Sequence, residues 1–135
     1  MRLVSVYKEP RAVALLYDLL KEREDHVNIS HRAMPTMSQH RKFVAKRPYS
    51  CWYLIDNEAG AYVGSIYLSR QDEIGVFIFR AFQRRSFAAD AIRLLMEKHQ
   101  RLHYLANINP ANAASIRLFA KFGFVHIQNT YELRP

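Results

Sequence analysis

The sequence predicts an α/β (α+β) domain in which a mixed central sheet carries helices on both faces. Three observations predict it: a hairpin-rich front half, a back half that alternates strand and helix patterns, and a hydrophobic content of 50% over 135 residues. The length suits one domain, residues 1–135, with a single core. The expected element order is β-α-α-β-β-β-α-β-α-β.

The chain opens with a strand and two helices. The first strand is RLVSVY, and Pro10 then marks the start of a helix. Residues 26–35 are expected to form a loop, after which Thr36 or Ser38 caps a short helix that ends near Lys46. The apolar positions of the first helix recur at helical spacing and are Val13, Leu16, Tyr17 and Leu20.

Three strands follow. Residues 50–56 and 61–69 alternate as strands do, and the turn between them at 56–60 is typical of a hairpin. Residues 73–79, EIGVFIF, are almost entirely apolar, which indicates a strand buried on both faces.

The back half is expected to fold as helix, strand, helix and strand. A short strand at 102–108, a helix within 109–124 and a last strand at 125–133 complete the chain. The third helix precedes them, and its apolar side comprises Phe87, Ala88, Ala91, Ile92, Leu95 and His99.

The net charge favours an anionic partner. Lys plus Arg exceed Asp plus Glu by 20 − 12 = 8. Nucleic acid, a phosphorylated metabolite and a phosphorylated cofactor all fit that charge, and so does a basic surface that serves solubility alone. Nucleic acid is not expected as a partner, because the arginines are dispersed and the aromatic signature of RNA-binding sheets is missing from the sequence.

Cysteine usage and hydropathy predict a cytoplasmic protein. Cys51 is the single cysteine, so an internal disulfide framework is excluded. No apolar run approaches the roughly 20 residues of a membrane span, and no secretory signal is visible. The histidines show no clustered spacing with Cys or carboxylates, so no metal is expected.

Residues 109–124, NPANAASIRLFAKFGF, contain more than the signals that start and end a helix. Pro110 suits a first helical turn with Asn109 as cap, or Asn112 caps the helix itself. Gly123 supplies the left-handed residue after the helix. These capping signals do not explain why Asn112 and Ser115 occur together at the helix N-terminus.

This pattern resembles the closing motif of the GCN5-related N-acetyltransferase (GNAT) family, whose central sheet is mixed and mostly antiparallel. The resemblance implies that Asn112 and Ser115 hydrogen-bond the pantetheine or phosphate region of coenzyme A. In this family a Tyr usually stands four residues after the motif Ser and faces the thiol. Phe119 holds that cofactor-side position here, and it has no proton to donate.

A second family motif, Q/R-x-x-G-x-G/A, lies in register between the apolar strand and the third helix. Backbone N–H groups at a helix N-terminus converge on one spot and favour an anion there, here the diphosphate of coenzyme A. Ser86 departs from the usual Gly, and a requirement for positive φ at this position would weaken binding. The alternative is a basic turn with Ser86 as cap. The motif residues are Gln83, Arg84, Arg85, Ser86, Phe87 and Ala88.

The resemblance implies transfer of an acetyl group from acetyl-CoA to an amine by direct attack in a ternary complex. Glu73 is the predicted base, because family members often hold a Glu where this strand opens; an ordinary exposed residue is the alternative. His31 is the second predicted catalytic residue, and His26 and His40 are its rivals, since histidine titrates near neutrality. A backbone N–H near Ile78 or Phe79 is expected to polarise the carbonyl.

The proton donor and the acceptor stay open in the sequence. Tyr104 or Tyr131 could stand near the departing thiolate and donate its proton, although most tyrosines in such strands only fill the core. An acidic acceptor such as a nucleotide-linked amino sugar fits the basic balance, while protein amines, N-terminal or lysine, and polyamines remain alternatives. Four aromatic residues of the hairpin could wall the acceptor pocket or fill the core: Trp52, Tyr53, Tyr62 and Tyr67.

Two further expectations concern activity and assembly. Ser86 and Phe119 motivate a rival hypothesis, an acyl-CoA-binding or regulatory module with little turnover. Family members often pair through their late strands, so the resemblance implies a homodimer.

Overall fold

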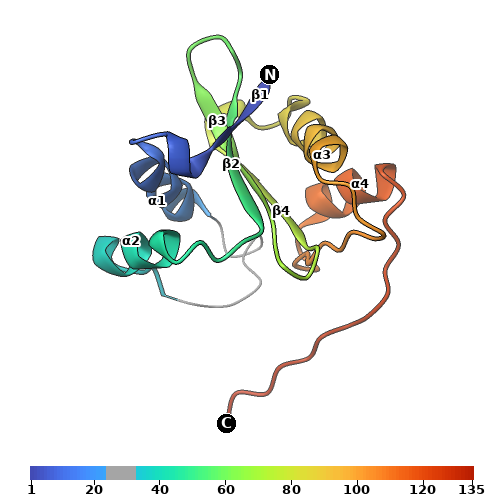
Figure 1. Cartoon of the computed structure of the whole chain (residues 1–135). Helices are drawn as coiled ribbons and strands as arrows, with labels where there is room; N and C mark the ends of the chain where they lie inside the picture. Colours follow the sequence, from blue (N-terminus) through green and yellow to red (C-terminus); the bar gives the residue numbers. More distant parts are fainter. Residues whose placement is uncertain (24–32) are drawn as a thin grey trace.

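A computed structural model describes residues 1–23 and 33–135, and its centre is a four-stranded antiparallel sheet in the order β1-β2-β3-β4 (Figure 1). The strands are β1 (Arg2–Ser5), β2 (Cys51–Asp56), β3 (Tyr62–Leu68) and β4 (Ile74–Ile78). The helices are α1 (Ala12–Glu22), α2 (Met37–Ala45), α3 (Phe87–Lys98) and α4 (Ala113–Lys121), with single 3-10 turns η1 (Val6–Lys8) and η3 (Arg80–Phe82). These elements confirm the predicted fold class, with boundaries close to those expected.

Helices cover both faces of the sheet, α1 and α2 on one side and α3 and α4 on the other (Figure 1). Successive side chains of a strand point to opposite faces, so each strand feeds two apolar layers. The layer under α1 and α2 contains Val6, Ala12, Leu16, Leu19, Val44, Trp52 and Leu54. The layer under α3 and α4 contains Ile55, Val63, Ile66, Leu68, Ile74, Ala91, Ile92, Leu95 and Phe119.

Local signals set the helix ends. Thr36 begins α2 with a capping box, in which its Oγ1 accepts from the Gln39 N–H at 3.1 Å and its own N–H donates to the Gln39 side chain at 2.9 Å. Asn112 caps α4 by accepting from the Ser115 N–H at 3.2 Å. Gly123 follows α4 with φ of 92°, the left-handed residue that the sequence predicted.

Two predicted strands are wrong as strands of the sheet. Within residues 102–108 the pairing shrinks to one parallel bridge between Glu73 and Leu105. Residues 125–133 alternate like a strand but pair with no strand among the described residues, and Figure 1 shows them running away from the sheet. A strand pattern specifies faces, whereas a strand also needs a partner for its backbone groups.

The strand predicted to be buried on both faces is only half-buried. Ile74 is buried, but the rest of β4 is of intermediate exposure. The reason is its place at the sheet edge, where beyond the bridge no further strand covers it. In the part of the chain that the model describes, no helix is long and apolar enough to cross a membrane.

Candidate active site

β4 and the segment after α3 meet at one point and then diverge. The Ile74 N–H donates to the Leu105 carbonyl at 2.8 Å, and the Leu105 N–H donates to the Asp72 carbonyl at 2.9 Å. Across the residues described here, no other backbone hydrogen bond joins β4 to this segment. The outer edge of β4 is therefore left unpaired beyond the bridge.

Strand alternation decides which amides face that open edge. Because the Ile74 N–H points away from β3, the N–H groups of Val76 and Ile78 point the same way. The Phe79 N–H donates instead to the Val63 carbonyl inside the sheet at 2.9 Å. Of the two amides predicted to polarise a carbonyl, only that of Ile78 is free to do so.

Glu73 is fixed at the bridge from both sides. One carboxylate oxygen accepts from the Ser69 hydroxyl at 2.9 Å, and the other accepts from the Asn107 amide on the diverging segment. The Ser69 hydroxyl oxygen in turn accepts from the N–H groups of Glu73 and Gln71 at 3.0 and 3.2 Å. The side chain is half-buried and held in place, which is unlike an ordinary exposed residue at a strand start.

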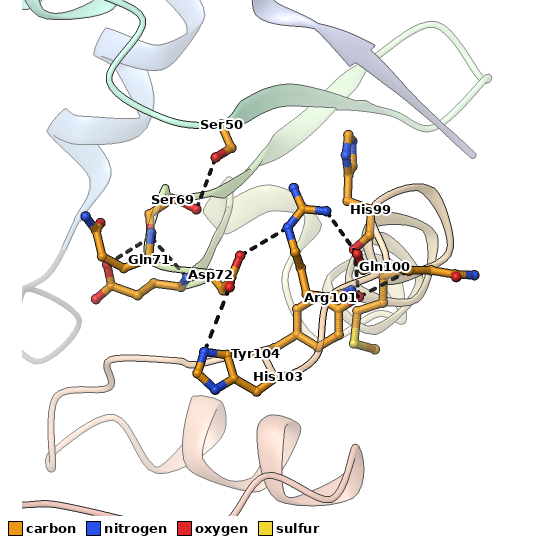
Figure 2. Close-up of polar contacts among 11 residues, drawn as sticks. Ser50, Ser69, Gln71, Asp72, His99, Gln100, Arg101, His103 and Tyr104 are labelled. Atoms are coloured by element: carbon orange, nitrogen blue, oxygen red, sulfur yellow. Dashed lines mark hydrogen bonds and ion pairs between the residues drawn. The ribbon is translucent and has the colours of Figure 1, made fainter.

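The turn before Glu73 is locked to the chain after α3 (Figure 2). Asp72 adopts a left-handed φ of 63°, and its carboxylate accepts from Arg101 Nε at 3.1 Å and lies 3.8 Å from His103 Nε2. Tyr104 belongs to the same network, because its hydroxyl donates to the His99 carbonyl at 2.7 Å. The Tyr104 hydroxyl proton is thus engaged by the backbone, so Tyr104 is not assigned as the proton donor of the reaction.

The second motif forms the loop from η3 into α3. Gln83 donates its side-chain amide to the Ile78 carbonyl at 3.0 Å, and Arg84 takes a left-handed φ of 62°. Within the described chain, the N–H groups of residues 84–88 have no hydrogen-bond acceptor. A run of free amides at the N-terminus of a twelve-residue helix is suited to bind a diphosphate.

Ser86 fits the position where the family usually has Gly. Its φ is −80°, so no left-handed conformation is required of it. Its hydroxyl donates to Asp90 at 2.9 Å, and Asp90 also accepts from Arg93 at 3.0 Å. The backbone amides and the exposed Arg84 and Arg85 side chains are therefore the groups that would meet an anion.

The α4 motif divides into polar groups and core. The side-chain oxygen Oδ1 of Asn112 caps the helix. Its Nδ2 and the Ser115 hydroxyl make no hydrogen bond within the described chain. Phe119 is 4% exposed and packs edge-on against Phe124, with ring centroids 5.0 Å apart. Phe119 is a core residue in this structure and has no proton to donate, so it does not take the role of the family's usual Tyr.

The face of β4 under α1 and α2 is aromatic. The Tyr67 ring lies against Gly75, where a Cβ atom would overlap it, and Tyr49 stacks on Tyr67 with centroids 3.8 Å apart. The Arg23 guanidinium lies 3.8 Å from the Phe77 ring centroid. Burial raises the pKa of Tyr67 and lowers the pKa of Arg23, since both charged forms are poorly solvated there.

Comparisons with known proteins support one family. The family model of the acetyltransferase (GNAT) domain, Acetyltransf_3, matches residues 3–125. The chain belongs to the GNAT acetyltransferase family. The resemblance read from the two motifs is thereby confirmed. A comparison with curated protein sequences finds no match.

Solved structures of similar fold include two N-acetyltransferases and a protein solved with acetyl-CoA. A spermidine N-acetyltransferase SpeG chimera from Vibrio cholerae and hSSAT has a TM-score of 0.71 at 15% identity, over 95% of this chain and 84% of that one. An N-acetyltransferase from Staphylococcus aureus Mu50 has a TM-score of 0.68 at 18% identity, over 94% of this chain and 83% of that one. The yncA protein of Salmonella typhimurium, solved with its cofactor acetyl-CoA, has a TM-score of 0.64 at 16% identity, over 91% of this chain and 77% of that one.

The histidines named from the sequence do not gather in this GNAT acetyltransferase. His26 and His31 lie outside the described residues. His40 is 3% exposed and its Nε2 lies 2.9 Å from the Val13 carbonyl, so it joins α2 to α1 instead of serving as a base. Burial lowers its pKa, which keeps the ring neutral. Among the described residues, no three His, Cys, Asp or Glu side chains form a metal-binding group.

The tyrosines and tryptophan of the hairpin divide between the two faces. Trp52, Tyr62 and Tyr67 share the face under α1 and α2, while Tyr53 points to α3 and places its hydroxyl 2.6 Å from His99 Nε2. Tyr53 is therefore not part of one wall with the others. Tyr131 lies in the C-terminal segment that runs away from the sheet (Figure 1), and 89% of its surface is exposed.

Sequence reasoning missed Arg23 and Asn107 in this acetyltransferase. Arg23 ends a charged helix tail, KER, which reads as a solvated surface. Asn107 sits in a predicted strand with no motif around it. The family motif was a usable signal for residues 83–88, but no local signal distinguished these two.

Glu73→Gln is expected to lower the rate of thiol release from acetyl-CoA by about a hundredfold, because general bases typically contribute 10² to 10⁴. The pH dependence of kcat should change as well, since the group proposed to accept the amine proton is gone. The measurement is a colorimetric thiol assay with the first amine that supports turnover. Glu97→Gln, on the exposed side of α3, is the control. An unchanged pH profile would eliminate Glu73 as the base.

Proposed function

We propose that this acetyltransferase domain moves an acetyl group from acetyl-CoA to the primary amine of a small acceptor, by direct attack in a ternary complex. One observation carries the proposal: the free amide of Ile78 and the anchored carboxylate of Glu73 lie along one strand that leads into the free amides of residues 84–88. A base, a carbonyl-polarising donor and an anion site are the groups that acyl transfer from a diphosphate-bearing thioester needs.

The cofactor is held by the chain's own polar groups. The amides of residues 84–88, with Arg84 and Arg85, bind the diphosphate, and Asn112 Nδ2 and the Ser115 hydroxyl hydrogen-bond the pantetheine arm. Bound acetyl-CoA supplies an activated acetyl thioester. The Ile78 N–H donates to the carbonyl oxygen that becomes negative as the amine attacks.

Proton movement depends on Glu73. An alkylamine has a pKa of about 10.4, so it must lose a proton before it can attack. Glu73 accepts that proton, directly or through a water, from the position where Ser69 and Asn107 hold it. Water is assigned as the acid for the thiolate, because Phe119 is buried and the Tyr104 hydroxyl is bonded to backbone.

Arg23 favours an anionic acceptor. Its Nε is buried and has no hydrogen-bond partner, and its guanidinium has no carboxylate partner within the described chain. A buried cation without a counter-charge is costly unless a ligand supplies one. Together with the rings of Tyr67 and Phe77, this supports an acceptor with a ring and a phosphate or carboxylate, such as a nucleotide-linked amino sugar.

Other acceptors fit less well. The spermidine acetyltransferase of similar fold is named for a polycation, which a buried guanidinium would repel. A protein N-terminal or lysine amine remains the alternative acceptor. The cytoplasmic setting expected from the lone Cys51 stays a prediction.

A module that binds acyl-CoA with little turnover is the second candidate function, and Phe119 favours it. The buried phenyl ring cannot donate the proton that the family's usual Tyr would give to the departing thiolate. Tight acetyl-CoA binding without thiol release over a broad amine panel would decide for this alternative.

We further propose that a second copy of the chain pairs with residues 125–133. Alternate apolar side chains of this extended segment are exposed: Val125 by 78%, Ile127 by 71%, Tyr131 by 89% and Leu133 by 87%. Such a segment has the side-chain period of a strand with one buried face, and it lacks a partner in the described chain.

Arg84→Glu combined with Arg85→Glu should weaken acetyl-CoA binding by about tenfold or more, because two charge-assisted contacts become repulsive. Isothermal titration calorimetry gives the dissociation constants. Lys98→Glu combined with Arg41→Glu is a matched double reversal away from the loop and should change binding little. Equal losses in the two variants would remove the diphosphate assignment.

Arg23→Met should abolish a preference for anionic acceptors while leaving the unliganded protein as stable as before, or more so, because it removes a poorly solvated charge that has no carboxylate partner among the described residues. The readouts are kcat/KM for amines that carry a carboxylate or phosphate against their neutral amides, and the thermal melting temperature. Arg41→Met is the control. A clear loss of melting temperature with no change in acceptor preference would mean that Arg23 only packs on Phe77.

Ile127→Glu combined with Leu133→Glu should convert a dimer into a monomer of 15.9 kDa, because two charges would enter the buried face of the paired strand. Light scattering after size exclusion measures the mass. Gln128→Glu, on the other face of the segment, should leave the dimer intact. A wild-type protein that is monomeric across a wide dilution series would contradict the proposal.

A further inference from the structure

A basic hollow lies at the β1 edge of the sheet, the edge opposite β4. Its volume is about 760 Å³. It opens where β1 ends: Ser5 pairs with Tyr53, and the earlier β2 residues Trp52 and Cys51 have no strand partner on that side. Ligand pockets commonly enclose several hundred Å³, so the hollow has the size for a small molecule.

Five cations and no carboxylate line this basic hollow, which is lined by Arg2, Lys8, Arg47, Arg70 and Lys98 together with aromatic and small residues. Arg2 is neutralised, since its Nε lies 2.8 Å from Asp56. The other four have no carboxylate partner within the described chain. Positive charge without counter-charge therefore concentrates at one concave place, where it attracts anions most strongly.

Two of these cations are held in place. Arg70 donates to the Arg47 carbonyl at 2.9 Å, and Arg47 takes a left-handed φ of 52°. The Arg47 guanidinium sits 4.1 Å from the Tyr7 ring centroid. The Tyr7 hydroxyl is itself anchored, because it donates to the Val44 carbonyl at 2.9 Å. Such preorganisation reduces the entropy lost when an anion binds.

Aromatic residues reach this edge from both faces of the sheet. Tyr49 and Trp52 pack edge-on with centroids 4.8 Å apart on the face under α1 and α2, where Tyr7 also lines the hollow, and Tyr53 lines it from the face under α3. The Trp52 indole nitrogen is buried without a hydrogen-bond acceptor. Flat aromatic surfaces beside arginines suit a ligand that carries both a phosphate and a planar base.

We infer that the basic hollow binds a nucleoside diphosphate, at a site separate from the acetyl-CoA site. The two sites lie on opposite edges of the sheet, β1 and β4. The cations bind the phosphates, and the tyrosines contact the base. The inference does not depend on acetyl transfer, because it rests on charge and shape at an edge that the proposed reaction does not use.

The test is calorimetric titration of UDP into the full chain with saturating coenzyme A present. We expect one UDP per chain, with affinity that falls as salt rises. Arg47→Glu combined with Arg70→Glu should weaken UDP binding by about tenfold or more. Arg41→Glu combined with Lys42→Glu, a matched reversal on the exposed side of α2, should leave it within about twofold.

A reciprocal pair of variants separates this site from the cofactor site. Lys8→Glu combined with Lys98→Glu should weaken UDP binding but not coenzyme A binding, and Arg84→Glu combined with Arg85→Glu should do the reverse. Lys8 and Lys98 are exposed and make no hydrogen bond in the described chain, so that pair also guards against a folding defect in the arginine variant. Displacement of UDP by coenzyme A, equal losses in the matched control, absence of UDP binding, or far tighter binding of oligouridylate than of UDP would each overturn the inference.

Discussion

The single parallel bridge between Glu73 and Leu105 is the constraint on which the proposed active site depends. Because the two segments meet there, Ser69 and Asn107 reach the Glu73 carboxylate from opposite sides. Because the segments part beyond it, the outward amides of β4, including that of Ile78, have no partner among the described residues. A longer ladder would have consumed those amides, and no bridge at all would have left the carboxylate without its second support.

Features that depend on neighbouring residues could be predicted from the sequence. The Thr36 and Asn112 caps, the left-handed Gly123 and the helix entry at residues 83–88 each follow from residues a few positions apart. Two family motifs predicted the cofactor loop, and the Glu that family members often hold where this strand opens predicted Glu73 as the base; both roles stay predictions. These signals are local in sequence and physically strong, so tertiary packing did not override them.

Features that depend on distant partners could not be predicted. Asn107 matters because the fold brings it to Glu73, and Arg23 because α1 ends above Phe77. Trp52 and Tyr53 look equivalent in the sequence, yet one position of alternation sends them to opposite faces of the sheet. The pattern of residues 125–133 specifies a strand but not the edge to which it would bond.

Gly75 sets a boundary for any remodelling of this enzyme. The Tyr67 ring fills the space that a side chain at position 75 would need, so this face consists of the β4 backbone covered by the Tyr67 phenol ring. Room for a bulkier molecule would have to come from shortening Tyr67 or Tyr49 at the stacked pair, not from the strand beneath them. If the proposed acceptor binds on this face, breadth of substrate use in engineered descendants would then be tuned by Tyr67 and Tyr49.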